Sequence, residues 1–328
     1  MGAGKIFLCT LLCLLGTFHP STGVAQLKGA TFIPQWVPQA QFAGYYVALE
    51  QGIYRKHGID LTILPGGPNS PPLEFLKEGK ADFASLWLST AVQARSRGVR
   101  LVNIAQIVQR SALMLVAKKS SGIFKPEDMN GKKVGLWPAF MTQPKAFFRK
   151  YNLEVRVVPQ SFSVNLFLWD GVDVASAMWY NEYHAIMSAG INPDELTTFF
   201  FHEHGINFPE DGIYILEENF DKDPEQCRAF VMASLEGWIY AFNNPEETLN
   251  MVMRNLKQEY IPATRVHQKW MLERMKDLIP PQDGTALTGR LLPEDYDRVV
   301  KALRAERLIE ETPEFEDFYR DCMGHGTK

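Results

Sequence analysis

A chain of 328 residues is long enough for two domains of ordinary size. Its composition, 46% hydrophobic and 22% charged, is typical of a globular protein and excludes a disordered or fibrous chain. The formal net charge of -4 gives no electrostatic basis for binding nucleic acid, and no basic patch is interleaved with aromatic residues.

Residues 1–25 have the layout of a secretory signal peptide. Lys5 precedes an apolar run over residues 6–18, and Gly23-Val24-Ala25 forms a small-residue cleavage site. The run is short for a membrane span, which leaves a buried N-terminal helix as the alternative. We therefore expect an exported, periplasmic protein whose mature chain begins at residue 26.

From residue 29 the chain alternates predicted strands and helices. The strands are expected at 30–34, 59–64, 81–86 and 99–108, and the helices at 41–57, 72–77 and 90–97. Strands separated by helices at this spacing predict right-handed crossovers and a largely parallel sheet.

An apolar strand at 111–118 leads into a second unit of the same kind. Its first strand follows the turn at Gly131 and ends at 137, and further strands are expected at 153–159, 172–178, 197–201 and 212–216. Its helices are expected at 140–150, 165–169 and 182–189. After residue 223 the pattern becomes helical, with helices at 224–243, 245–257, 263–278, 293–305 and 313–322, several of them starting with proline.

This pattern predicts an α/β fold of two lobes, each a mostly parallel sheet flanked by helices, with a helical C-terminal part. Lobe 1 would comprise residues 26–113 and 213–328, and lobe 2 residues 114–212. The extended segments 113–118 and 211–216 would cross between the lobes and act as hinges.

An ordered set of short motifs resembles the substrate-binding proteins of ABC importers, most nearly the branch that handles pyrimidine precursors of thiamine. Binders of riboflavin, sulfonate and nitrate are relatives of that branch. The motifs are Trp36-x-Pro38, Gly44-Tyr45-Tyr46-Val47-Ala48, Gly52-Ile53-Tyr54, His57-Gly58-Ile59-Asp60, Gly79-Lys80-Ala81-Asp82-Phe83, Met129-Asn130-Gly131-Lys132-Lys133-Val134-Gly135 and Gly171-Val172-Asp173. The resemblance covers nearly the whole mature chain. It implies a periplasmic binding protein fold of type II, and a monomer that delivers a small solute to an ABC permease in the inner membrane.

The same superfamily contains an enzyme, the thiamine-pyrimidine synthase, which consumes its own histidine and pyridoxal phosphate. Its lysine after the third strand and the histidine four residues later correspond to Leu86 and Thr90, and its cysteine-rich loop corresponds to residues 205–211, which lack cysteine. Without an amine no Schiff base can hold pyridoxal phosphate. We therefore expect no catalytic residue and no cofactor, with the synthase as the alternative.

Aromatic and polar residues follow the predicted strands of both units. Ligands collect at the carboxyl ends of strands in open α/β sheets, so two such edges predict a cleft between the lobes. The candidate ligand-binding residues are Trp36, Gln39, Tyr45, Ser85, Trp87, Trp137, Tyr180, Asn181, Glu182 and Asp211. The alternative for each ring is a place in a lobe core, and the alternative for Asn181 and Glu182 is the cap and acidic first turn of a helix.

These residue types suit a planar heteroaromatic solute. Rings can stack on it, while the amide of Asn181 and the carboxylate of Glu182 can bond an aminopyrimidine-like edge. We expect a thiamine pyrimidine precursor first and riboflavin second. No arginine lies among the cleft motifs, which disfavours sulfonate or nitrate. A sensor ectodomain or accessory subunit is a third possibility.

Two further groups of residues remain open. His202-Glu203-His204 with Asp211 could suggest zinc, but no third ligand stands at useful spacing, so we expect no metal. Cys227 and Cys322, the cysteines of the mature chain, could form one bridge in an oxidising compartment or remain free thiols.

Overall fold

The computed structural model describes Met1 and residues 26–280 and 289–324. The predicted signal peptide therefore lies outside the described residues, except for Met1. None of the helices in the described ranges is long and apolar enough to cross a lipid bilayer.

The first sheet has five strands in the order β2-β1-β3-β10-β4. Its strands are β1 (Lys28–Ile33), β2 (Ile59–Ile63), β3 (Phe83–Leu86), β4 (Leu101–Val108) and β10 (Glu210–Leu216). β1 pairs in parallel with β2 and β3, whereas β10 runs antiparallel to both β3 and β4. β10, which lies between β3 and β4, thus comes from a distant part of the chain.

The second sheet repeats this arrangement in the order β7-β6-β8-β5-β9. It contains β5 (Leu113–Lys118), β6 (Lys133–Leu136), β7 (Arg156–Pro159), β8 (Val174–Met178) and β9 (Leu196–Phe200). β6 is parallel to β7 and β8, and β5 is antiparallel to β8 and β9. The predicted two-sheet α/β architecture is confirmed. Each sheet is mixed, because one strand, β10 in the first and β5 in the second, runs against its neighbours while the other four share one direction.

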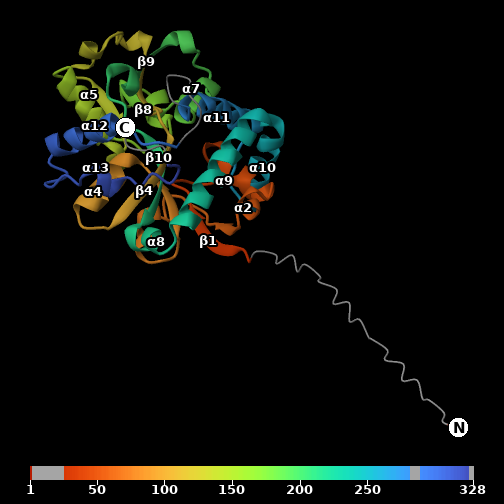
Figure 1. The fold of residues 1–328 in the computed structure, drawn as a ribbon. Helices are drawn as coiled ribbons and strands as arrows, with labels where there is room; N and C mark the ends of the chain where they lie inside the picture. The colour runs from red at the N-terminus through yellow and green to blue at the C-terminus, as the bar shows by residue number, and fades with distance from the viewer. Residues whose placement is uncertain (2–25, 281–288, 325–328) are drawn as a thin grey trace.

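Helices cover both sheets (Figure 1). They are α1 (Ala43–Glu50), α2 (Ile53–Lys56), α3 (Pro72–Lys77), α4 (Leu88–Ser96), α5 (Thr142–Lys150), α6 (Asn165–Leu168), α7 (Glu182–Ser188), α8 (Glu217–Lys222), α9 (Pro224–Asn243), α10 (Pro245–Gln258), α11 (Arg265–Leu278), α12 (Pro293–Ala305) and α13 (Phe315–Phe318). The one helix predicted over 41–57 is divided into α1 and α2, because Gly52 adopts a left-handed φ of 69°.

The C-terminal helices are distributed over both lobes. α9 and α10 pack on α1 in the first lobe, whereas α11 reaches α7 and α12 reaches α5 in the second (Figure 1). The helix predicted over 313–322 is reduced to α13, because Tyr319 is extended and bridges to Asn103 of β4. The backbone N–H of Arg320 donates to the carbonyl of Asn103 at 2.9 Å, so this extended segment pairs with the outer edge of β4, a strand whose eight residues are all buried.

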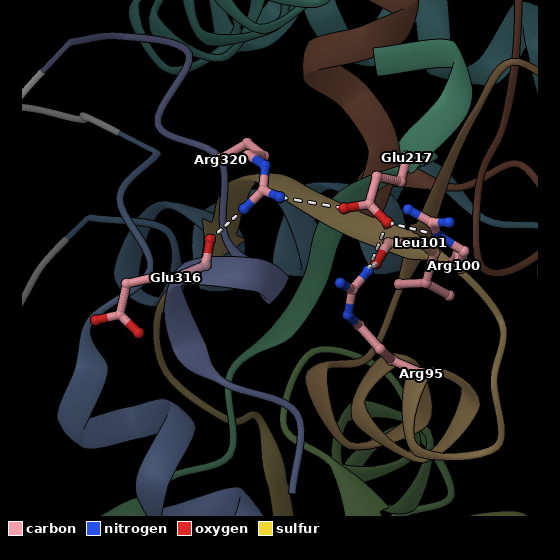
Figure 2. Close-up of polar contacts among 6 residues, drawn as sticks. All are labelled: Arg95, Arg100, Leu101, Glu217, Glu316 and Arg320. Atoms are coloured by element: carbon pink, nitrogen blue, oxygen red, sulfur yellow. Dashed lines mark hydrogen bonds and ion pairs between the residues drawn. The ribbon is translucent and has the colours of Figure 1, made fainter. Parts of the chain in front are cut away.

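An ion-pair cluster fastens this C-terminal segment to the first lobe (Figure 2). The carboxylate of Glu217 lies 2.9 Å from Nε of Arg100, 3.2 Å from a guanidinium nitrogen of Arg320 and 3.7 Å from one of Arg95. Burial opposes ionisation of Glu217, but the hydrogen bond and charges of these arginines leave its pKa below the ordinary value.

Of the two possibilities for the cysteines of the mature chain, a bridge or free thiols, the structure has the second: Cys227 and Cys322 are free.

The contact between α1 and α9 is unusually close. An added Cβ at Gly237 would lie 2.2 Å from the carbonyl oxygen of Gly44 and 2.7 Å from Cβ of Ala48. An added Cβ at Gly44 would in turn lie 2.4 Å from the ring of Trp238. Because α1 follows the loop that leaves β1, this packing fixes the base of that loop.

We predict that Gly237→Ala lowers the free energy of unfolding by about 1–2 kcal/mol. The clash with backbone at Gly44 is severe and costs about 2–3 kcal/mol, the upper part of the usual range for overpacking, while better helix propensity returns about 1 kcal/mol. Urea denaturation would measure the change. Gly29→Ala is the matched control, since its added Cβ meets nothing within 4 Å. Equal stability of the two variants would contradict the packing argument.

Candidate functional site

A cavity of about 90 Å³ lies between the two lobes, where strand ends of both sheets meet. Its first-lobe wall is the segment after β1 and the residue that follows β3. Its second-lobe wall follows β6, β7 and β8. The lining residues are Gln35, Trp36, Gln39, Gln41, Trp87, Trp137, Phe140, Phe162, Met178, Tyr180, Asn181 and Glu182. The carboxyl edges of the two sheets therefore supply its walls, as expected for an open α/β fold.

Ring pairs join the two lobes across this cavity. Trp36 of the first lobe meets Phe162 of the second with ring centroids 4.7 Å apart and an interplanar angle of 62°. Trp87 meets Phe140 at 4.1 Å and 33°. On the second-lobe wall, Trp137 is held by a 2.9 Å hydrogen bond from its Nε1 to the carbonyl of Ser161. The lobes are closed on one another, with aromatic rings at the contact.

Seven of the ten sequence-predicted residues line the cavity, and three do not. Tyr45 lies in the core of the first lobe, 4.5 Å from the ring of Phe32, because its position on α1 faces the sheet. Ser85 is fully buried behind the wall, where its hydroxyl accepts a 2.7 Å bond from the backbone N–H of Gln35. Asp211 lies one residue deeper, behind Gln41.

Sequence reasoning missed five lining residues: Gln35, Gln41, Phe140, Phe162 and Met178. Phe162 carried a usable sequence signal, because it is an aromatic residue in a polar loop directly after β7. In the structure its side chain is 57% exposed. Phe140 stands three residues after Trp137, close to the same strand end. Gln35 stands beside Trp36 in the same loop as the predicted Gln39 and so carried a signal, whereas Gln41 is predicted to open a helix and had none.

A chain of amides runs from the cavity into the interior. Nε2 of Gln39 donates to Oε1 of Gln41 at 2.5 Å, and Nε2 of Gln41 donates to Oδ2 of Asp211 at 2.5 Å. Oε1 of Gln35 is buried without a hydrogen-bond partner among the described residues. Because an unbonded buried acceptor is costly, it marks a place for a donor on a bound molecule.

Glu182 is the one ionisable carboxyl in the cavity wall that the structure describes. It starts α7, and its Oε2 accepts the backbone N–H of Met178 at 3.0 Å while its Oε1 accepts Nδ2 of Asn181 at 2.8 Å. Burial raises the pKa of Glu182 to about 7, so both protonation states are accessible near neutral pH. Of the helix-cap alternative only the acidic first turn is present, because Asn181 occupies the N-cap of α7 without a side-chain cap hydrogen bond; the carboxyl of Glu182 also lines the cavity.

Two further buried carboxyls lie where the chain crosses between the lobes. Glu210 accepts the hydroxyl of Ser111 at 2.7 Å and the backbone N–H of Ala112 at 2.8 Å. Burial and the neighbouring Asp211 raise the pKa of Glu210 to about 8, and burial raises the pKa of Asp211 to about 7. Asp211 also has a left-handed φ of 46°. The crossing is therefore built on acids that the folded protein prefers to keep protonated.

The histidine pair has separate partners on the other side of this crossing. Nδ1 of His202 lies 3.1 Å from the carbonyl of Ser111, and Nδ1 of His204 lies 2.5 Å from the hydroxyl of Tyr151. Across the described part of the chain, no group of three or more histidine, cysteine, aspartate or glutamate residues is arranged to hold a metal ion.

We predict that Glu210 contributes a fall in the free energy of unfolding as pH rises from about 5 to 8, so that the slope against pH is less negative in Glu210→Gln than in the parent. Over that range folded Glu210 keeps a proton that the unfolded chain, with an ordinary carboxyl, has released. One such proton gives a slope of up to about 1.4 kcal/mol per pH unit. Chemical denaturation across this pH range measures it. The exposed Glu127→Gln is the control, and an unchanged slope in Glu210→Gln would refute the assignment.

The chain is similar to known binding proteins over most of its length. A profile of the family described as NMT1/THI5 like matches residues 39–248. The formylaminopyrimidine-binding protein of Halalkalibacterium halodurans is 23% identical over 298 residues, 87% of each chain. The riboflavin-binding protein RibY of Chloroflexus aurantiacus is 24% identical over 296 residues, 86% of this chain and 82% of RibY.

The match to a synthase covers a smaller part of the chain, whereas the match to a solved structure covers most of it. The 4-amino-5-hydroxymethyl-2-methylpyrimidine phosphate synthase of Legionella pneumophila is 30% identical over 105 residues, 32% of this chain and 33% of the synthase. The periplasmic aliphatic sulphonate binding protein SsuA of Escherichia coli superposes with a TM-score of 0.68 at 14% identity, covering 88% of this chain and 96% of that one. This likeness confirms the predicted periplasmic binding protein fold.

Proposed function

The chain is a member of the NMT1/THI5-like family, and from that premise we propose that it is the solute-binding component of an ABC importer for a planar heteroaromatic solute. The observation that carries the proposal is the ring-lined cavity between the carboxyl edges of the two sheets. Rings from both lobes can enclose a flat molecule, and aromatic stacking contributes about 0.5–1.5 kcal/mol per pair beyond burial. The solute classes named for the two relatives that match most of the chain, formylaminopyrimidine and riboflavin, are both planar heterocycles.

A thiamine pyrimidine precursor is our first choice of solute, with riboflavin second. The cavity of about 90 Å³ is small compared with usual ligand pockets, which favours the smaller of the two solutes. The polar groups also suit an aminopyrimidine. Glu182 in its ionised form can accept the exocyclic N–H, in its protonated form it can donate to a ring nitrogen, and Gln35 offers a free acceptor.

The charges of the wall argue against a sulfonate or nitrate. No lysine, arginine or histidine is among the described residues that line the cavity, and its single carboxyl would repel an anion when ionised. An anion buried there would lack a countercharge, which is strongly unfavourable.

We also propose that the protein is not a synthase. Leu86 is a buried residue of β3 and Thr90 lies within α4, so neither position supplies the amine that a Schiff base with pyridoxal phosphate requires. Incubation with pyridoxal phosphate should give no Schiff-base absorbance; a lysine-dependent band would favour the enzyme.

The setting of the proposed function is the periplasm. The N-terminal sequence has the layout of an export signal, and SsuA of Escherichia coli, which has a similar fold, is a periplasmic binding protein. There a monomer would capture its solute and pass it to a permease in the inner membrane.

We predict that Trp36→Ala and Glu182→Gln each weaken binding of formylaminopyrimidine by about tenfold or more. Trp36→Ala removes a ring contact, and Glu182→Gln removes a buried charged acceptor. Titration calorimetry with formylaminopyrimidine, riboflavin, taurine and nitrate would rank the solutes and measure both variants. Trp169→Ala is the matched control, because that tryptophan is 78% exposed and does not line the cavity. If the parent binds and both site variants bind equally well, the proposed site is wrong.

A further inference from the structure

We propose that α11 clasps the two lobes together and sets how far they close over the cavity, with Trp270 and Arg274 as its positioning residues. Neither residue lines the cavity. The chain itself crosses between the lobes twice, once between β4 and β5 and once between β9 and β10. α11 supplies a further connection that depends entirely on side chains.

On its first-lobe side, α11 holds the loop that carries the amides of the cavity. The buried Gln268 accepts the backbone N–H of Ala40 through Oε1 at 2.7 Å. The sulfur of Met271 accepts the backbone N–H of Gln41 at 3.2 Å. These bonds fix the backbone between Gln39 and Gln41, whose side chains line the first-lobe wall.

On its second-lobe side, α11 holds the turn between β8 and α7. Nε1 of Trp270 donates to the carbonyl of Trp179 at 3.0 Å. The guanidinium of Arg274 lies 4.8 Å from the ring centroid of Trp179 and 4.4 Å from that of Trp270, within reach of both rings for cation–π attraction. Trp179 directly precedes residues 180–182, which form the second-lobe wall of the cavity.

A pair of histidines extends the same contact. The ring of His267 on α11 stacks on that of His184 on α7, with centroids 4.7 Å apart and planes 24° apart. Burial lowers the pKa of both rings, which leaves them neutral at pH 7 and allows them to stack without charge repulsion. The contact between α11 and the second lobe thus runs from His267 to Arg274 along one side of the helix.

The position of these contacts gives α11 its role. One helix bonds the backbone beside Gln39 and Gln41 in one lobe and the backbone beside Tyr180 in the other. The two walls of the cavity are therefore held opposite each other through α11. The contact between Arg274 and Trp270 lies within α11 and is kept in any arrangement of the lobes. When the lobes separate, the contact of Arg274 with Trp179 and the bond from Trp270 to Trp179 must break, so their strength favours the closed arrangement. Loss of the cation–π contact with Trp179 should shift this equilibrium about tenfold toward the open arrangement.

The test compares Arg274→Ala with Arg265→Ala on the same helix. Arg265 bonds Glu246 and Asn250 of α10, within the first lobe, so its loss should leave the lobes as they are. Small-angle X-ray scattering of the full-length mature protein without ligand should show a larger radius of gyration for Arg274→Ala and the parental value for Arg265→Ala. With formylaminopyrimidine as the probe, Arg274→Ala should bind about tenfold more weakly. Arg274→Lys keeps the charge but loses the planar stack, and should recover part of both effects.

Scattering of the ligand-free protein decides the clasp independently of the solute. If Arg274→Ala scatters like the parent and binds the probe equally well, the inference is overturned. If Arg274→Ala does not fold, Trp270→Phe replaces it, since an aromatic ring is kept beside Arg274 while the N–H that bonds Trp179 is removed; parental scattering in that variant also overturns the clasp. The affinity measurement rests on the proposed function, and failure of the parent to bind the probe counts against that function while the scattering result stands.

Discussion

The carboxyl group of Glu210 is the point on which the two-lobed architecture depends. It accepts hydrogen bonds from Ser111 and Ala112 on the outgoing segment and itself begins β10, the returning strand. One buried side chain therefore ties together both passages of the chain between the sheets. Asp211 follows it into the same buried region. Burying two acids is unfavourable, and hydrogen bonds from Ser111, Ala112 and Gln41 offset part of that cost.

Placing the cavity next to this crossing has a chemical consequence. Glu182, Gln39 and Gln41 supply hydrogen-bonding groups to the cavity, and Gln41 connects Gln39 to the buried Asp211. Rings from both lobes form the rest of the wall. These features are the basis on which we propose a flat solute with N–H groups and ring nitrogens rather than an anion. α11 braces the same two walls from outside, so the groups that would contact a solute and those that control closure are separate but adjacent.

Much of the candidate site could be predicted because residues after parallel strands gather at one edge of a sheet. Trp36, Trp87, Trp137 and residues 180–182 were found by that rule. Tyr45 was misplaced because helical position alone does not say which face of α1 meets the sheet, and it packs on Phe32 instead. Phe140 and Phe162 reach the cavity only because the second lobe closes against the first, a contact between segments more than fifty residues apart in the sequence.

The amino-acid sequence by itself determined the alternation of strands and helices, the two α/β units and the aromatic character of the strand ends, because each depends on local periodicity and on the nature of single residues. Tertiary structure alone decided the antiparallel entry of β5 and β10, the burial of Glu210 and Asp211, and the meeting of α11 with Trp179. Those features arise from pairings between distant segments, and the free energy of a long-range contact is set by the geometry of both partners rather than by either sequence segment.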